Sequence, residues 1–399
     1  MRRILKWFAS APRVKRVSIA RQGVELADLL GRETINLDTP ELQRFLAGKR
    51  VLVTGAGGSI GSEICRQTMR FLPERLLMLE RAENNLFEID RELRETWVGA
   101  DVRPYIADVC DARRIRQVFD SERPHVVFHC AAHKHVPMME ANPCEAIKNN
   151  VFGTRIVADV SAESGVAAFV LVSTDKAVNP TSVMGATKRF AELYVQSLNA
   201  AGETSDQTTR FLAVRFGNVL GSSGSVVPIF QRQIEAGGPV TVTHPEMKRY
   251  FMTIPEASQL VMQAGAIGQG GEIFVLDMGS QVKILDLAHE LIRRNGLQPG
   301  EDIEVTFSGI RPGEKLYEEL ANDDDQTRPT AHPKIRVWQL PRATPTQVKH
   351  GLEILWSAAS SGAPTQATTA LAACVPEYRL HNPTRTPHAP MRLVEAEAA

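Results

Sequence analysis

Short apolar runs alternate with amphipathic helical segments along the chain from about residue 50. The runs RVLVTG, RLLMLE, HVVFHCAA and AFVLVSTD have the continuous apolar character of buried strands. Between them lie segments such as SIGSEICRQTMRF and NNLFEIDRELRETW, in which apolar residues recur at helical spacing. This alternation predicts an α/β fold built on a doubly wound parallel sheet.

The pattern changes along the chain and predicts four segments. Residues 1–48 are a basic leader that ends in a short helical segment, and residues 49–276 form the main α/β domain. Residues 277–345 carry a helix (ILDLAHELIRRNG), a strand (EVTFSG) and a polar loop (IRPGEKLYEEL), which predict a smaller C-terminal substrate-binding lobe. Residues 346–399 are rich in Ala, Pro and Thr and predict a partly disordered C-terminal extension, because this composition buries little apolar area.

Composition and charge narrow the function classes. The 46 Lys and Arg residues balance 46 Asp and Glu residues, so no overall field draws the 399-residue chain to nucleic acid. The five cysteines are scattered without CxxC spacing, which favours a reducing, cytoplasmic setting over a metal or redox pair. No apolar run approaches the roughly eighteen residues that a membrane span needs. We therefore expect a cytoplasmic protein with no membrane span and no nucleic-acid partner.

A glycine-rich turn, TGAGGSIG, directly follows the strand RVLV and opens a helix. Gly55 permits the tight turn, Gly58 lets the backbone approach a pyrophosphate, and Gly61 lets the helix pack closely on the strand. Ser59 and Ile60 begin the helix, whose N-terminus faces the anion. Because the strand and the helix flank the motif as required, the motif predicts a dinucleotide-binding site in the main domain.

The ends of the next two strands supply candidate contacts to the adenosine half of the dinucleotide. Glu80 ends RLLMLE about twenty residues beyond Gly61 and is placed to accept hydrogen bonds from the ribose hydroxyls, which disfavours a 2′-phosphate. Arg81 can instead bind such a phosphate, so NAD is favoured over NADP without excluding it. Asp108, followed by Val109, either hydrogen-bonds the adenine or caps the turn before ARRIRQVF.

The segment STDKAVNPTSVMGATK carries the strongest candidates for chemistry. Asp175 and Lys176 place an acid and a base side by side at the carboxyl end of a strand, where open α/β sheets bind ligands; the alternative is a surface salt bridge or a turn. Such a pair suits elimination of water better than simple hydride transfer. Met184 precedes Lys188 by four residues, and its thioether cannot take up the proton of a hydroxyl. Either catalysis is lost, or other residues transfer the proton.

Several motifs together resemble a known superfamily. The spacing TGxxGxxG, HCAAHKHVP and the later Lys188 resemble the extended short-chain dehydrogenases/reductases, which have a Rossmann-like sheet and normally a Tyr four residues before the Lys. STDKAVNPTSVMGATKR, with AAHKHVPMMEANP before it and RFGNVLGSSGSVVPIF after it, resembles nucleotide-sugar 4,6-dehydratases of the polysaccharide-biosynthesis type from about Leu29 to Pro341. It is most similar to UDP-N-acetylglucosamine 4,6-dehydratases, usually membrane-anchored, in which Met also replaces the Tyr. Met184 is then a characteristic residue of this subfamily.

The resemblance implies a hydro-lyase with an internal NAD redox cycle, acting on UDP-N-acetylglucosamine in surface polysaccharide or glycan biosynthesis. NAD takes a hydride from sugar C4, water leaves across C5 and C6, and the hydride returns to C6. Lys176 removes the C5 proton and Asp175 protonates the departing hydroxyl. Lys188, near the nicotinamide ribose, and burial under the sugar are expected to depress the pKa of Lys176. Thr174 relays the C4 hydroxyl proton, and Met184 shields the hydride path.

The loop after the fourth strand, AAHKHVP, admits two interpretations. His129, Cys130, His133 and His135 crowd into one segment, which suggests a metal site, but the loop character favours a place beside the cofactor and no metal. The cofactor contacts expected here are Ala131 and Ala132, and the pocket-lining residues are Lys134 and His135. A buried asparagine at Asn149 or Asn150 either orients this loop through backbone hydrogen bonds or caps a helix.

The resemblance also assigns substrate contacts to Asn218, Arg249, Arg311 and Glu314. The fork of Arg311 suits a diphosphate, and the amide of Asn218 can both donate and accept toward the sugar. In isolation Arg311 reads as an ordinary surface arginine, and MKRYF around Arg249 reads equally as a packed strand with charged edges.

Three function classes stay open: a 4,6-dehydratase, an epimerase or reductase of the same fold, and a non-catalytic nucleotide-binding scaffold. An epimerase would normally need Tyr at position 184, and intact Asp175, Lys176 and Lys188 weigh against the scaffold. The resemblance also implies a homo-oligomer that binds a UDP-sugar. The similar proteins usually carry membrane spans, whereas only about twenty residues precede RQGVELADLLG here. The basic leader is a candidate for peripheral contact with the inner face of the membrane.

Overall fold

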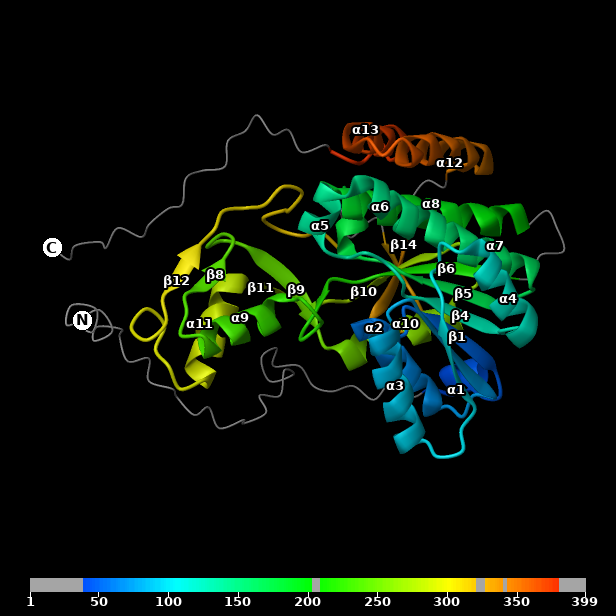
Figure 1. Ribbon diagram of the computed structural model, residues 1–399, viewed down its shortest axis with the longest axis horizontal. Coiled ribbons are helices and arrows are strands. Elements are labelled where there is room, and N and C mark those ends of the chain that lie inside the picture. Colours follow the sequence, from blue (N-terminus) through cyan, green and yellow to red (C-terminus); the bar gives the residue numbers. More distant parts are fainter. Residues whose placement is uncertain (1–38, 203–208, 321–326, 340–342, 380–399) are drawn as a thin grey trace, which may run out of the picture.

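The computed structural model describes residues 39–202, 209–320, 327–339 and 343–379 of the chain (Figure 1). Residues 1–38 of the leader and residues 380–399, for which membrane contact and disorder were expected, lie outside these ranges. Within them, no helix combines the length and the apolarity that crossing a membrane requires.

The main sheet has nine strands in the order β13-β14-β10-β6-β5-β4-β1-β2-β3. Seven strands run parallel to one another. At one edge, β14 pairs antiparallel with β10, and β13 pairs antiparallel with β14. The predicted α/β fold with a doubly wound parallel sheet is confirmed. The strands are β1 (Arg50–Thr54), β2 (Arg75–Glu80), β3 (Val102–Ile106), β4 (Val126–His129), β5 (Ala168–Val172), β6 (Arg210–Arg215), β10 (Ile273–Leu276), β13 (Thr327–Pro329) and β14 (Ile335–Trp338).

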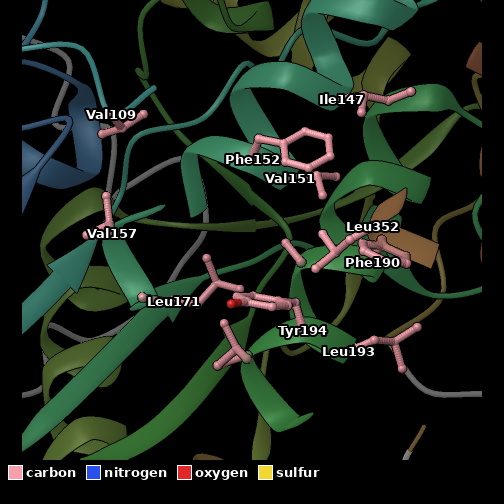
Figure 2. Close-up of a cluster of buried hydrophobic side chains, with 14 of the residues drawn as sticks. Val109, Ile147, Val151, Phe152, Val157, Leu171, Phe190, Leu193, Tyr194 and Leu352 are labelled. Atoms are coloured by element: carbon pink, nitrogen blue, oxygen red, sulfur yellow. The ribbon is translucent and has the colours of Figure 1, made fainter. Parts of the chain in front are cut away.

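Helices cover both faces of this sheet because alternate strand residues are apolar on both sides. In β1, Leu52 belongs to the core on one face, and Val51 and Val53 belong to the core on the other. The first face is covered by α4 (Ala112–Glu122), α7 (Thr154–Glu163) and α8 (Val183–Gly202), and Figure 2 shows part of its core, with Leu171 beside Tyr194. The second face is covered by α1 (Pro40–Leu46), α2 (Ser59–Met69), α3 (Glu83–Thr96) and α10 (Ile254–Ile267).

A smaller lobe lies beside the main sheet and has its own apolar core, which includes Phe230, Val240, Phe251 and Leu291 (Figure 1). The residues that form this lobe differ from the prediction, in which the lobe began at residue 277. The chain enters the lobe before that point, and β13 and β14 return to the main sheet, where β14 pairs with the buried strand β10. The lobe contains β7 (Asn218–Val219), α9 (Val226–Glu235), β8 (Val240–Val242), β9 (Lys248–Met252), β11 (Gln281–Lys283), α11 (Ile284–Arg294) and β12 (Val305–Phe307).

The first part of the C-terminal extension, which was expected to be partly disordered, forms two helices. Residues 345–374 form α12 (Pro345–Ser360) and α13 (Pro364–Cys374), which pack against α8 and α6 (Pro143–Ile147) (Figure 1). The extension buries Leu352, Leu355 and Leu371, and its many alanines let the helices approach closely. These helices cover α8, and the homo-oligomer that the resemblance implies stays a prediction.

Candidate active site

The glycine turn between β1 and α2 has the geometry that the sequence predicts. Gly55 has φ +66°, a conformation that favours glycine. A Cβ at Gly61 would come within 2.0 Å of the carbonyl oxygen of Gly55, so only glycine allows the helix to approach the strand this closely. At Gly58 an added Cβ would meet one atom, the carbonyl oxygen of Gly55 at 3.2 Å, which is a tight contact but far less severe than at Gly61.

Two alanine substitutions are expected to separate the roles of these glycines. Gly61→Ala forces α2 away from β1 and should lower both thermal stability and NAD affinity, the latter at least tenfold. Gly58→Ala should keep the fold but weaken NAD binding, because its methyl group occupies the approach to the pyrophosphate. Thermal unfolding and equilibrium dialysis measure the two effects, and equal loss of stability in both variants would contradict the division.

Residues at the ends of β2 and β3 meet beside the glycine turn. Glu80 Oε2 accepts a hydrogen bond from Gly57 N at 3.3 Å, and Glu80 Oε1 accepts from Arg81 N at 2.9 Å. Asp108 Oδ1 accepts from Cys110 N at 2.8 Å, so its turn role is present, and Asp108 Oδ2 lies 3.9 Å from Arg81 Nη1. The structure thus gathers Glu80, Arg81 and Asp108, while their contacts to a nucleotide stay predictions.

The loop after β4 is fixed by a buried asparagine, as one of the two interpretations predicts. Asn150 Oδ1 accepts from His133 N at 2.8 Å, and Asn150 Nδ2 donates to His133 O at 3.0 Å and to Thr187 Oγ1 at 3.1 Å. Asn150 lies in a wide helical turn, η2 (Lys148–Gly153), which precedes α7. This contact holds Ala131 and Ala132 near the turn, and Ala131 N lies 3.4 Å from Thr54 Oγ1.

His129 is a structural residue. Its ring nitrogens contact Thr54 Oγ1 at 2.7 Å and Thr154 Oγ1 at 3.0 Å, and the imidazole is fully buried. Burial and then the charge of Lys188 lower the pKa of His129 to about 3, so it is neutral. Over the ranges that the structure describes, no three His, Cys, Asp or Glu side chains gather as a metal site would require.

The segment after β5 brings together the acid, the base and an amide. Thr174 caps the short helix η3 (Asp175–Ala177), and its hydroxyl donates to Asp175 Oδ1 at 2.9 Å. Lys176 Nζ donates to the same Asp175 oxygen at 3.0 Å and to Asn218 Oδ1 at 3.1 Å. Asp175 and Lys176 follow the end of β5, whereas Asn218 belongs to the small lobe. The three side chains meet at Lys176 Nζ.

Glu318 completes this cluster, although no local sequence pattern distinguished it from the other acids of GEKLYEEL. It is 4% exposed, and its Oε1 lies 3.8 Å from Lys176 Nζ. Burial, and then the charge of Asp175, raise the pKa of Glu318. Burial lowers the pKa of Lys176, but Asp175 and Glu318 outweigh burial and raise that pKa above its ordinary value. The expected depression by Lys188 is therefore wrong for this state of the protein.

Lys188 is the lysine whose pKa is depressed. It lies on α8 one turn after Met184, and the two side chains are 4% and 3% exposed. Burial lowers the pKa of Lys188 to about 8. Met184 belongs to the apolar core on the α8 side of the sheet, so it also packs as an ordinary core residue. A buried lysine beside a thioether suits orientation of a polar ligand rather than a surface ion pair.

Arg249 is placed differently from the substrate contact expected of it. Its guanidinium donates to the backbone carbonyls of Lys248, Lys315 and Leu316, at 2.7, 2.7 and 3.1 Å, and is 6% exposed. Its Nε lies 3.7 Å from Glu318 Oε1. The donors that a diphosphate would use are thus taken by the loop that carries Glu318, so Arg249 acts on the site by holding that loop.

The remaining substrate candidates lie around the rim. Arg311 is half-exposed and pairs with Glu314, with Nη2 2.5 Å from Oε1. Part of its guanidinium is therefore occupied by this ion pair. His135 packs against Gly224, where an added Cβ would come within 2.7 Å of the imidazole. Lys134 and His135 are both exposed at the surface. These positions are open to a ligand, and contact with a sugar nucleotide stays a prediction.

Three buried polar atoms indicate where ligand groups fit. Asp175 Oδ2, Lys188 Nζ and Glu318 Oε2 are inaccessible and have no hydrogen-bond partner within the described ranges. Buried polar atoms are rarely left unpaired, so each fits a complementary group of a bound molecule. Together with the glycine turn, these atoms fit a dinucleotide at that turn and a hydroxyl-rich substrate at the end of β5.

Comparisons with known proteins identify the family of the chain. A model of a family described as polysaccharide biosynthesis protein matches residues 51–340. The capsular polysaccharide biosynthesis protein CapD of Staphylococcus aureus is 59% identical over 303 residues, which cover 76% of this chain and 50% of CapD. The chain therefore spans about half the length of this relative.

More distant relatives have enzyme names. The inverting UDP-N-acetylglucosamine 4,6-dehydratase of Campylobacter jejuni is 35% identical (69% of this chain, 78% of the relative), and the UDP-glucose 4-epimerase of Rickettsia akari is 34% identical (70% and 80%). The X-ray structure of Pen from Bacillus thuringiensis has 35% identity and a TM-score of 0.69, covering 75% of this chain and 90% of Pen. The chain thus belongs to the polysaccharide biosynthesis protein family, within the extended short-chain dehydrogenase/reductase superfamily.

Proposed function

We propose that this chain is an NAD-dependent UDP-N-acetylglucosamine 4,6-dehydratase of surface polysaccharide or glycan biosynthesis. The observation that carries the proposal is the hydrogen-bonded pair of Asp175 and Lys176 at the end of β5, with Met184 at the position where the superfamily normally has a Tyr. A relative of 35% identity is named as an enzyme of this activity. Glu80 beside the glycine turn favours NAD over NADP.

The acid and base roles follow from the hydrogen bond between the two side chains. Lys176 and Asp175 form an ion pair in the structure, with Nζ 3.0 Å from Oδ1. One proton passed along this bond gives a neutral amine and a carboxylic acid, the two forms that elimination needs. The amine then accepts the C5 proton, the acid gives its proton to the C6 hydroxyl, and water leaves. The elimination thereby restores the ion pair. When the hydride returns to C6, Lys176 gives a solvent-exchanged proton to C5, and the proton released by the C4 hydroxyl replaces it.

The other residues position the sugar and control its C4 hydroxyl. Bound NAD would supply reversible hydride acceptance, which side chains lack and which the C4 ketone requires. Thr174 directs its hydroxyl toward Asp175 at 2.9 Å and is a route for the C4 proton. Lys188 offers an unpaired ammonium for the nicotinamide ribose, and Met184 keeps water from the hydride path.

The direct test is incubation of the protein with UDP-N-acetylglucosamine in deuterated water without added cofactor. NMR is expected to show a C6 methyl group and deuterium at C5, because the C5 proton exchanges with solvent and bound NAD regenerates itself. Conversion to the C4 epimer without a C6 methyl would favour the second candidate, an epimerase. An unchanged sugar with bound nucleotide, repeated with other UDP-sugars, would favour a non-catalytic scaffold.

A pH measurement tests the base. Because Glu318 helps to raise the pKa of Lys176, Glu318→Gln is expected to lower the apparent pKa of the Asp175–Lys176 pair. Since the pair must carry a single proton to react, loss of the Glu318 charge should move the kcat profile to lower pH. Glu319→Gln is the matched control, because Glu319 is exposed and contacts Asn179 instead. A shift to higher pH, or equal shifts in both variants, would contradict the assignment.

A further inference from the structure

The segment that follows α13, residues 375–379, lies against the catalytic loop (residues 173–183) and is here named the C-terminal strap. Val375 and Tyr378 are buried, and Arg379 N donates to Pro180 O at 2.9 Å. Burial, and then the charge of Glu140, raise the pKa of Tyr378. Glu140 in turn accepts from Val183 N at 2.7 Å, where α8 begins. The strap therefore meets the catalytic loop after Lys176.

A chain of charged side chains also links the strap to the residue before Thr174. Glu377 Oε1 accepts from Arg189 Nη2 at 3.2 Å, and Arg189 Nη1 donates to Glu192 Oε2 at 3.4 Å. Glu192 Oε1 accepts from the hydroxyl of Ser173 at 2.6 Å. Ser173 N also donates to Val214 O at 2.7 Å, so this residue fixes the exit of the chain from β5.

The charged side chains in the middle of this chain are buried, and Glu377 at its end is about one-third exposed, with a side-chain exposure of 36%. Arg189 and Glu192 have side-chain exposures of 4% and 0%, so their interactions are poorly screened by water. Arg215 lies 2.5 Å from Glu192 Oε2 and is also buried. The positive charges of Arg189 and Arg215 are thus balanced by the negative charges of Glu192 and Glu377. Without the charge of Glu377, Arg189 is drawn toward Glu192 and competes with Ser173 for it.

We propose that Glu377 is a positioning residue that fixes the Asp175–Lys176 pair through Arg189, Glu192 and Ser173. This role rests on the proposed dehydratase function. The family match ends at residue 340, before the strap, so the positioning element belongs to the extension rather than to the matched segment. Glu377 contacts no reacting atom; it sets the geometry of the residues that do.

The test compares Glu377→Gln with Glu353→Gln in the full chain. The first variant keeps the shape and removes the charge; the second removes an exposed charge from α12 of the same extension. Glu377→Gln is expected to lower kcat by roughly tenfold to a hundredfold, with KM changed less than about twofold, because misplacement of the pair affects the chemical step more than binding. Glu353→Gln should match the wild type in both constants.

Amide hydrogen exchange gives a readout that does not depend on the reaction. The amides of Ala177 and Val178, which donate to Thr174 O and Asp175 O, should exchange roughly tenfold faster in Glu377→Gln, while the glycine turn keeps its rate. Loop exchange equal to that of Glu353→Gln would overturn the proposal. If the wild type leaves UDP-N-acetylglucosamine unchanged, the proposed function fails, and faster loop exchange would still support the positioning role.

Discussion

Lys176→Ala is expected to abolish dehydration and to leave NAD binding intact. The substitution removes the amine that takes the C5 proton, and general base catalysis of this kind contributes about 10²–10⁴-fold to the rate. It also leaves Asp175 without its partner at 3.0 Å, so the acid loses the source of its proton. Turnover should fall by about 10³-fold or more when followed by NMR, whereas nucleotide released on denaturation should equal that of the wild type.

Lys148→Ala provides the control for this experiment. Lys148 is half-exposed, pairs with Glu145 on the surface and is expected to contribute little to stability or turnover. Normal dehydration by Lys176→Ala would exclude Lys176 as the base. Loss of both dehydration and bound nucleotide would instead indicate that Lys176 supports the fold of the site, and thermal unfolding separates this outcome from a chemical one.

The sequence was sufficient for those parts of the site that depend on local order. The glycine turn is set by three residues within one strand-turn-helix unit, so its spacing alone predicts Gly55 at a positive φ and Gly61 against the Gly55 carbonyl. Asp175 and Lys176 follow a recognisable buried strand, and the carboxyl ends of parallel strands meet at one edge. Asn150 was predicted as one of two alternatives and fixes the loop at His133.

The parts that could not be predicted depend on contacts between distant segments. Glu318 lies more than a hundred residues after Lys176 and arrives on a loop that Arg249 holds by its backbone. The sequence therefore did not indicate that Glu318 lies beside Lys176. It also did not indicate the direction in which the pKa of Lys176 shifts. The same holds for the extension, because its composition did not show which part would form helices that pack against α8. Charge balance in a buried site is a property of the folded chain.

The second large effect concerns stability, at the buried carboxylate of Glu192. Glu192 is fully buried, accepts from Arg215 Nε at 2.6 Å and from Ser173 Oγ at 2.6 Å, and lies near Arg189. Removal of one partner leaves an uncompensated buried charge, which costs about 3–5 kcal/mol. Glu192→Ala is therefore expected to lower the free energy of unfolding by about 3–5 kcal/mol in urea titrations. Glu163→Ala, at an exposed surface pair, should cost about 1 kcal/mol or less.

The pH dependence of unfolding distinguishes a charged Glu192 from a merely space-filling one. Burial raises the pKa of Glu192, but Arg215 and the hydrogen bonds outweigh it and lower that pKa below its ordinary value of 4.5. The unfolded chain then binds the proton first as pH falls, so the stabilising contribution is present above the unfolded pKa and is lost below it. Wild-type stability should therefore fall more steeply than that of Glu192→Gln as the pH drops below about 5. Parallel curves for the two proteins would show that Glu192 is not ionised in the folded protein.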